Sequence, residues 1–188
     1  NELCVRSILY AYNASCEDLL NLDSDFLNKT LAVGFKDGRT YILEKYMDND
    51  WVSLDKCDIS KFGKKDVIDI IINVAEALKA LHNHDLIYQD MSLSHIMYNQ
   101  KDKKIKLINY TKVWKKGKKR LCINNTYLPP ESLGNVNYGE PDLSSDIFSL
   151  GILAKNFIKT EILEKDRDLK GVIKKAMETS VDHRTKSC

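Results

Sequence analysis

The most constraining feature of this sequence is a segment near residue 150 whose apolar side chains would face every side of a helix. Ser144, Ser145 and Asp146 are suitable N-cap residues, and the pattern predicts a helix from them through about residue 158. Its apolar side chains are Ile147, Phe148, Leu150, Ile152, Leu153 and Phe157. A helix that is hydrophobic all round is stable only when other elements surround it. We therefore expect a central, buried helix with the rest of the chain packed around it.

Three other segments have the apolar spacing of helices. Residues 64–84 repeat apolar side chains along one face, which predicts a long helix with one buried side. Residues 169–179 place lysines opposite apolar side chains and predict a last amphipathic helix. A short apolar stripe over residues 14–22 predicts a brief helix near the N-terminus.

The extended segments are joined by turn residues. Residues 30–35 and 40–46 flank Asp37-Gly38, a pair typical of a tight hairpin turn. Beyond this hairpin the pattern predicts a short extended piece, a second hairpin and a long irregular segment, at residues 86–89, 96–108 and 109–131. The order of elements predicts an α+β fold, with a small head followed by a helical body.

Composition favours one globular domain. The chain has 188 residues, 43% of them hydrophobic, and its net charge of +2 gives no reason to expect nucleic acid or an anionic membrane as the main partner. No run approaches the roughly 20 apolar residues that span a bilayer, and the N-terminus lacks the pattern of a signal peptide. The five cysteines include no C-x-x-C pair, which argues against a zinc site and a disulfide framework. We expect an intracellular, cytoplasmic protein with reduced thiols and no membrane partner.

Several motifs occur in an order that resembles one family. Residues 86–97 (Leu-Ile-Tyr-Gln-Asp-Met-Ser-Leu-Ser-His-Ile-Met) and 109–111 (Asn-Tyr-Thr) resemble the catalytic and metal-binding loops of eukaryotic-type protein kinases. Residues 126–131 look like the end of a kinase activation segment, and residues 145–151 look like the start of the family's central buried helix. Residues 182–184 resemble its closing Asp and Arg. The resemblance implies a protein kinase-like fold.

The resemblance also implies a reduced upper lobe. About 30 residues precede the first hairpin, too few for the three strands that carry the family's glycine-rich loop and lysine. We therefore expect a single kinase-like domain over residues 1–188. A minimal N-lobe and hinge of one short helix plus a β-hairpin would occupy residues 1–47, with a mainly α-helical C-lobe over 48–188. Because residues 159–168 form a short interval for this family, the usual helix after the central buried helix is expected to be absent.

Most groups that phosphoryl transfer requires are replaced. The sequence contains no G-x-G-x-x-G loop, and by resemblance only Asp90 survives among the catalytic groups. Asn109 stands in place of the metal-binding Asp and lacks the negative charge that Mg²⁺ prefers. His95 stands in place of the second ligand, and imidazole suits softer ions. Ser92 replaces the family's catalytic-loop Lys, and Gln89 replaces the Arg that precedes the catalytic Asp. The resemblance implies a pseudokinase with no metal site, in which Asp90 is a vestigial catalytic residue or holds its loop through backbone hydrogen bonds.

A nucleotide pocket is a second expectation from the resemblance. Glu44 and Met47 would lie at the hinge, Met97 at the pocket floor and Asn109 beside the phosphates. A buried Glu44 would require a polar partner. We expect no required cofactor, although ATP could bind without efficient Mg²⁺-dependent catalysis.

Three residues are expected to have structural roles. By resemblance, Glu131 pairs with Arg184 and fixes the activation segment. The carboxylate of Asp146 would accept hydrogen bonds from the backbone of the catalytic loop. Both interactions would stabilise the body whether or not chemistry occurs.

Residues 112–120 form the strongest charge feature of the chain. This segment is either a solvated loop or a docking patch for an acidic protein, phosphate or nucleic acid. Trp114 would anchor such a partner. The candidate interaction residues are Trp114, Lys115, Lys116, Lys118, Lys119 and Arg120.

These features lead to three hypotheses. The first is a catalytically inactive kinase-like protein that acts as a scaffold, allosteric regulator or decoy, with a protein partner such as a kinase or a kinase substrate. The second is an atypical minimal Ser/Thr kinase or nucleotide-dependent transferase that uses Asp90. The third is a binder of nucleic acid or phosphate through the basic segment, although nucleic acid is the less expected partner.

Overall fold

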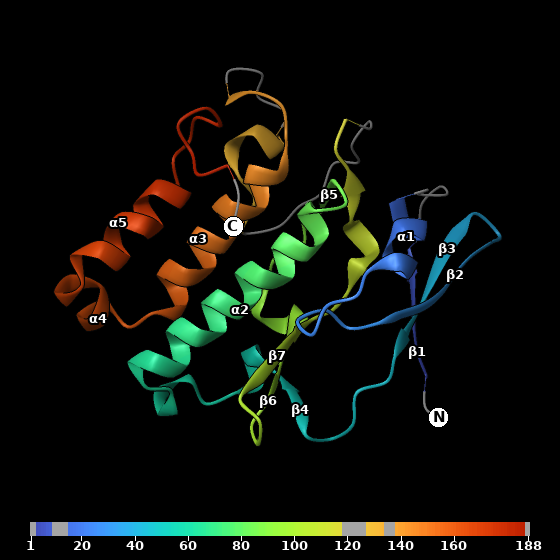
Figure 1. The fold of residues 1–188 in the computed structure, drawn as a ribbon, viewed down its shortest axis with the longest axis horizontal. Helices are drawn as coiled ribbons and strands as arrows, with labels where there is room; N and C mark the ends of the chain where they lie inside the picture. Colours follow the sequence, from blue (N-terminus) through green and yellow to red (C-terminus); the bar gives the residue numbers. More distant parts are fainter. Residues whose placement is uncertain (1–2, 9–14, 118–126, 134–137, 187–188) are drawn as a thin grey trace.

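Helix α3 (Leu143–Phe157) is the central element of the helical body in the computed structural model (Figure 1). The structure describes residues 3–8, 15–117, 127–133 and 138–186. Most residues of α3 are buried, and the helix packs against α2 (Lys64–His82) and α5 (Arg167–Ala176). The prediction of a central buried helix is therefore confirmed.

The cap of α3 differs from the prediction. Asp142, in extended conformation before the helix, accepts a hydrogen bond from the backbone N–H of Ser144 at 2.8 Å. The hydroxyl of Ser145 in turn accepts one from the backbone N–H of Asp142 at 3.1 Å, which completes a reciprocal cap. Asp142 is therefore the N-cap residue, and the prediction that Ser144, Ser145 and Asp146 provide the N-cap was wrong: all three belong to the first turn, where the Ser145 side chain contributes to the cap.

A three-stranded antiparallel sheet forms the upper lobe, in the order β1-β3-β2. Its strands are β1 (Leu3–Ile8), β2 (Thr30–Lys36) and β3 (Arg39–Lys45), and the short helix is α1 (Ser15–Asp18). The prediction of one hairpin plus a short helix was wrong about β1, which pairs with β3 along its whole length. The sequence of β1 begins with three consecutive apolar residues, Leu3-Cys4-Val5, and lacks the alternation of apolar and polar residues that is typical of an edge strand. The strand is therefore identified by its pairing with β3 and not by its sequence.

The hairpin between β2 and β3 has the predicted turn. Lys36 pairs with Arg39 and leaves Asp37 and Gly38 as a two-residue loop. Both loop residues have positive φ angles, 50° and 74°, as the twist of a tight hairpin requires.

Two smaller sheets lie in the body, and their strands β5 (Leu86–Ile87) and β6 (Ile96–Asn99) flank the loop that contains Asp90. The first sheet has the order β4-β6-β7, with β4 (Trp51–Ser53) and β7 (Lys104–Leu107). The second pairs β5 with β8 (Trp114–Lys115). The hairpin of β6 and β7 confirms the second predicted hairpin. Backbone hydrogen bonds of Leu107 with Phe26 and Asn28 attach β7 to the upper lobe.

The interval between α3 and α5 contains a helix. Helix α4 (Thr160–Lys165) occupies six residues of it, so a short helix is present in the interval where we expected the family's usual helix to be absent. Asp166 caps the next helix by accepting a hydrogen bond from the backbone N–H of Leu169 at 3.0 Å, and it forms an ion pair with Lys64 at 2.9 Å. Within the described ranges, no helix is both long and apolar enough to cross a membrane.

Gly151 sets the distance between α3 and α5. A Cβ atom at this position would lie 2.8 Å from Cγ of Met177 and 3.1 Å from Cβ of Ala176. Gly171 also lies in a helix, but a Cβ atom there would meet nothing within 4 Å.

We expect opposite effects from the same substitution at these two glycines. Gly151→Ala should lower the free energy of unfolding by about 1–2 kcal/mol because the new methyl group overpacks the helix contact. Gly171→Ala should raise it by about 0.5–1 kcal/mol because alanine favours the helix. Urea denaturation followed by circular dichroism measures both. Equal stabilisation by the two substitutions would contradict the close packing of α3 on α5.

Candidate functional site

The candidate site is built around Asp90, in the loop between β5 and β6. The side chain is almost fully buried, and its Oδ1 accepts a hydrogen bond from Nζ of Lys112 at 2.7 Å. Its Oδ2 accepts one from the amide Nδ2 of Asn109 at 3.3 Å. The surviving carboxylate is therefore held by a cation and an amide of the same chain.

Asn109 and His95, at the two positions where the resemblance places metal ligands, bond to each other. The amide Nδ2 of Asn109 donates to Nε2 of His95 at 2.9 Å, while Nδ1 of His95 donates to the backbone oxygen of Asp90 at 2.8 Å. The other end of the Asn109 amide, Oδ1, accepts from the hydroxyl of Thr111 at 2.8 Å. Asn109 has a left-handed backbone, with φ 63°, which turns its side chain toward the Asp90 loop.

These residues do not fit a hard divalent cation. The N–H group of Asn109 points at Asp90 and His95, and a donor cannot coordinate a cation. Elsewhere in the described ranges, no three His, Cys, Asp or Glu side chains gather as a metal site would require.

Asp146, in the first turn of α3, anchors the start of the loop that contains Asp90. Its two carboxylate oxygens accept hydrogen bonds from the backbone N–H groups of Tyr88 at 2.7 Å and Gln89 at 2.9 Å. Nε2 of His82 on α2 donates to the same carboxylate at 2.9 Å. Gln89 has a positive φ of 62°, and this unfavourable backbone is held by the hydrogen bonds to Asp146. The structure thus gives Asp146 the contacts that the resemblance implies.

Two tyrosines fill the interior beside the loop. The rings of Tyr88 and Tyr110 meet edge to face with centroids 6.5 Å apart, and the Tyr88 hydroxyl donates to the backbone oxygen of Ile108. The Tyr110 hydroxyl lies 2.7 Å from the oxygen of Leu107 and 2.9 Å from that of Asn28, and shares its proton between them. Burial raises the pKa of Tyr88, and the Asp90 carboxylate raises it further, so this hydroxyl stays a donor.

The expected nucleotide-pocket residues occupy different environments. Glu44 at the end of β3 is fully buried, and its Oε2 accepts a hydrogen bond from Nδ2 of Asn28 at 3.0 Å. The same Nδ2 also donates to the backbone oxygen of Lys45 at 2.9 Å. Met47 and Met97 are half-buried. Asn28 therefore provides a polar partner of the kind that a buried Glu44 requires.

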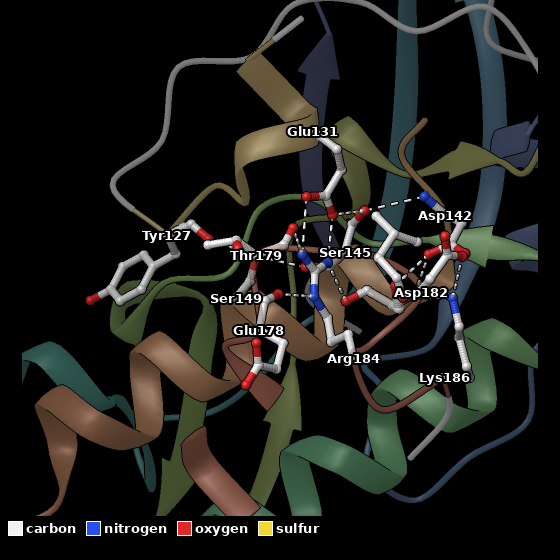
Figure 2. A network of polar contacts seen from close by, with 12 residues as sticks. Tyr127, Glu131, Asp142, Ser145, Ser149, Glu178, Thr179, Asp182, Arg184 and Lys186 are labelled. Atoms are coloured by element: carbon white, nitrogen blue, oxygen red, sulfur yellow. Dashed lines mark hydrogen bonds and ion pairs between the residues drawn. The ribbon is translucent and has the colours of Figure 1, made fainter. Parts of the chain in front are cut away.

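A buried ion pair joins the segment before α3 to the C-terminal part of the chain. Figure 2 shows the guanidinium of Arg184 facing the carboxylate of Glu131, with Nη1 donating to Oε1 and Nη2 donating to Oε2 at 3.0 Å. Neither side chain has any exposed area. The hydroxyl of Ser145 adds a hydrogen bond to Glu131 at 2.9 Å, so the pair is also tied to α3. This is the contact that the resemblance implies.

The basic segment is only partly described. Trp114 and Lys115 are half-buried in β8, and Lys116 is exposed. Nζ of Lys115 forms an ion pair with Asp18 of α1 at 2.8 Å. Lys118, Lys119 and Arg120 lie outside the described residues. Two lysines of the predicted docking patch, Lys112 and Lys115, are therefore engaged within the chain.

Sequence reasoning missed two partners. Lys112 was grouped with the basic segment and not with Asp90. Its position in the sequence does not reveal that the backbone brings its side chain back to the loop that contains Asp90. Nothing in the sequence around Asn28 predicts its role. The only indication was that a buried Glu44 requires a hydrogen-bond donor.

Comparison with known proteins places these features in context. A family model described as "Protein kinase domain" matches residues 14–187. Cyclin-dependent kinase 12 of Caenorhabditis elegans is 28% identical over 120 residues, which are 60% of this chain and 16% of that protein. The CaM kinase-like vesicle-associated protein of Danio rerio is 26% identical over 108 residues, covering 55% and 23% of the two chains. The chain thus spans less than a quarter of these relatives.

A solved structure extends the similarity to the fold. The Cydia pomonella granulovirus kinase PK-1 aligns with 98% of this chain and 81% of its own chain. The TM-score is 0.76 and the sequence identity 15%, so the two chains share a fold.

Proposed function

Since the chain belongs to the protein kinase family, we propose that it is a catalytically inactive member that works by binding another protein. Its role would be that of a scaffold, an allosteric regulator or a decoy. A kinase or a kinase substrate is the kind of partner that this role favours. We place the function inside the cell, where the free thiols of Cys16 and Cys57 would stay reduced.

The hydrogen bond between Asn109 and His95 carries this proposal. Phosphoryl transfer in this family depends on metal ions that neutralise the charge of the phosphates. Here the two candidate ligand side chains satisfy each other at 2.9 Å, and neither brings a negative charge. A nucleotide could still bind through the hinge region, but the groups that would orient its phosphates through a metal are missing.

One observation favours a second candidate, the atypical kinase. Lys112 places an ammonium group 2.7 Å from Asp90, close to the loop in which Ser92 stands instead of the family's lysine. A cation beside the carboxylate could take over part of the charge stabilisation that the missing lysine provides. In that case Asp90 and Lys112 would both be required for activity.

The test is incorporation of labelled phosphate from ATP into the chain itself and into a general protein substrate, with Mg²⁺ or Mn²⁺. We expect the wild-type chain to give no more incorporation than Asp90→Ala. Incorporation that is lost in both Asp90→Ala and Lys112→Met would overturn the proposal and support the atypical kinase. Lys116→Met is the matched control, because Lys116 is exposed on the same segment.

A further inference from the structure

A pocket of about 420 Å³ lies between α3, α4 and α5. Of these helices, α4 and α5 lie at the end of the body opposite the β1-β3-β2 sheet (Figure 1). Leu163 of α4, Ile173 of α5 and Met177 form its apolar lining, and Ile173 is buried. The volume is within the range of small-molecule sites and would hold one large apolar side chain of a partner.

Three lysines surround this apolar lining. Lys155 extends from α3, and Lys170 and Lys174 extend from α5, all three exposed to solvent. Among the residues that the structure describes, none forms an ion pair or a side-chain hydrogen bond with these lysines. By contrast, Lys64 near the same helices is paired with Asp166.

The charge around the pocket is unbalanced. Glu178 is the single acidic residue that lines it, against the three lysines, and no ion pair joins Glu178 to Lys174 in the described part of the chain. Lys170 and Lys174 lie four positions apart on one helix, where like charges repel and destabilise the helix. An anionic partner would relieve this repulsion.

The pocket wall is held in place by the buried ion pair. Nε of Arg184 donates to the backbone oxygen of Glu178 at 2.8 Å, and Nη2 donates to that of Thr179 at 3.3 Å (Figure 2). Both residues line the pocket. A wall fixed in this way needs little rearrangement on binding, which favours affinity.

We propose that this pocket binds an acidic peptide segment of a partner protein, with one apolar anchor side chain against Leu163, Ile173 and Met177. Acidic residues on either side of the anchor would pair with Lys155, Lys170 and Lys174. The biological role of this peptide site rests on the proposed protein-binding function, whereas the binding itself does not depend on it. Peptide binding and phosphate transfer are measured separately, so either can fail without the other.

The test is fluorescence anisotropy with a labelled peptide that has one Phe flanked on both sides by Asp and Glu. Lys170→Glu combined with Lys174→Glu should weaken binding at least about tenfold, as expected when attraction becomes repulsion. Leu163→Ser should weaken binding of this peptide too. A second peptide with Ser in place of Phe should bind the wild-type chain at least about fivefold more weakly because the anchor is lost.

Lys165→Glu combined with Lys175→Glu is the matched control. Lys165 is exposed on α4 and Lys175 is exposed on α5, neither lines the pocket, and the change in net charge is the same. This variant should bind the Phe peptide within about twofold of wild type. An equal loss in both double variants, or no loss in Lys170→Glu/Lys174→Glu, would overturn the proposal. Stronger binding to phosphatidylserine vesicles or single-stranded DNA than to the peptide, lost in Lys170→Glu/Lys174→Glu, would assign the pocket to a membrane or nucleic acid instead.

Discussion

Arg184→Met should lower the free energy of unfolding by about 3–5 kcal/mol, because it breaks a buried ion pair. Arg184 and Glu131 have no exposed side-chain area, so removal of the guanidinium would leave a buried carboxylate without its cation. The guanidinium also donates to the backbone oxygens of Ser144, Glu178 and Thr179. These groups would lose donors that buried water could not easily replace. Urea denaturation followed by circular dichroism measures the loss.

The double variant Glu131→Leu/Arg184→Met separates the ion pair from its surroundings. Because an apolar pair of similar volume leaves no uncompensated charge, it should recover at least about 1 kcal/mol relative to Arg184→Met. Lys186→Met is the control, since Lys186 is largely exposed and should change stability by no more than about 0.5 kcal/mol. A loss below about 1 kcal/mol for Arg184→Met would mean that this pair does not anchor the body.

This ion pair holds the helical body together independently of the residues around Asp90. Glu131 lies in the segment before α3, Ser145 in the first turn of α3, and Arg184 beyond α5, and their side chains meet in one buried cluster (Figure 2). Asp146 then connects α3 to the loop of Asp90 through the N–H groups of Tyr88 and Gln89. These contacts stabilise the fold and require no nucleotide.

Sequence periodicity was sufficient for the long elements and insufficient for the short ones. α2 and α3 have strong apolar patterns, and the Asp37-Gly38 turn has its own chemistry, so all three could be predicted. β4 and β8 have three and two residues, too few for a period to be visible. They exist because β6 and β5 offer them backbone partners.

The resemblance predicted which residues belong to the candidate site, but it did not predict which of them contact one another. That Asn109 stands where the resemblance places an acidic metal ligand is visible in the sequence. That Asn109 would bond to His95, or that Lys112 would reach Asp90, depends on the left-handed backbone at Asn109 and on the path of the following loop. Such contacts between distant residues leave no periodic signal.

Asn109→Asp combined with His95→Asn should create a response to Mg²⁺-ATP that we do not expect from the wild-type chain. The first change brings a carboxylate and the second an amide oxygen, both ligands that Mg²⁺ accepts. It also removes the hydrogen bond that joins the two positions at 2.9 Å. At a ligand concentration of about 100 times Kd, stability should rise by about 2.7 kcal/mol, measured as an increase in Tm on addition of Mg²⁺ at constant ATP.

His95→Asn alone is the control, because it breaks the same hydrogen bond without adding charge and should give no Mg²⁺-dependent increase. An increase in the wild-type chain as large as in the double variant would show that Asn109 and His95 do not block a metal. No increase in the double variant would mean that a further group keeps the metal out. Lys112 is then the residue to replace next, because its ammonium lies 2.7 Å from Asp90 and would repel a cation bound there.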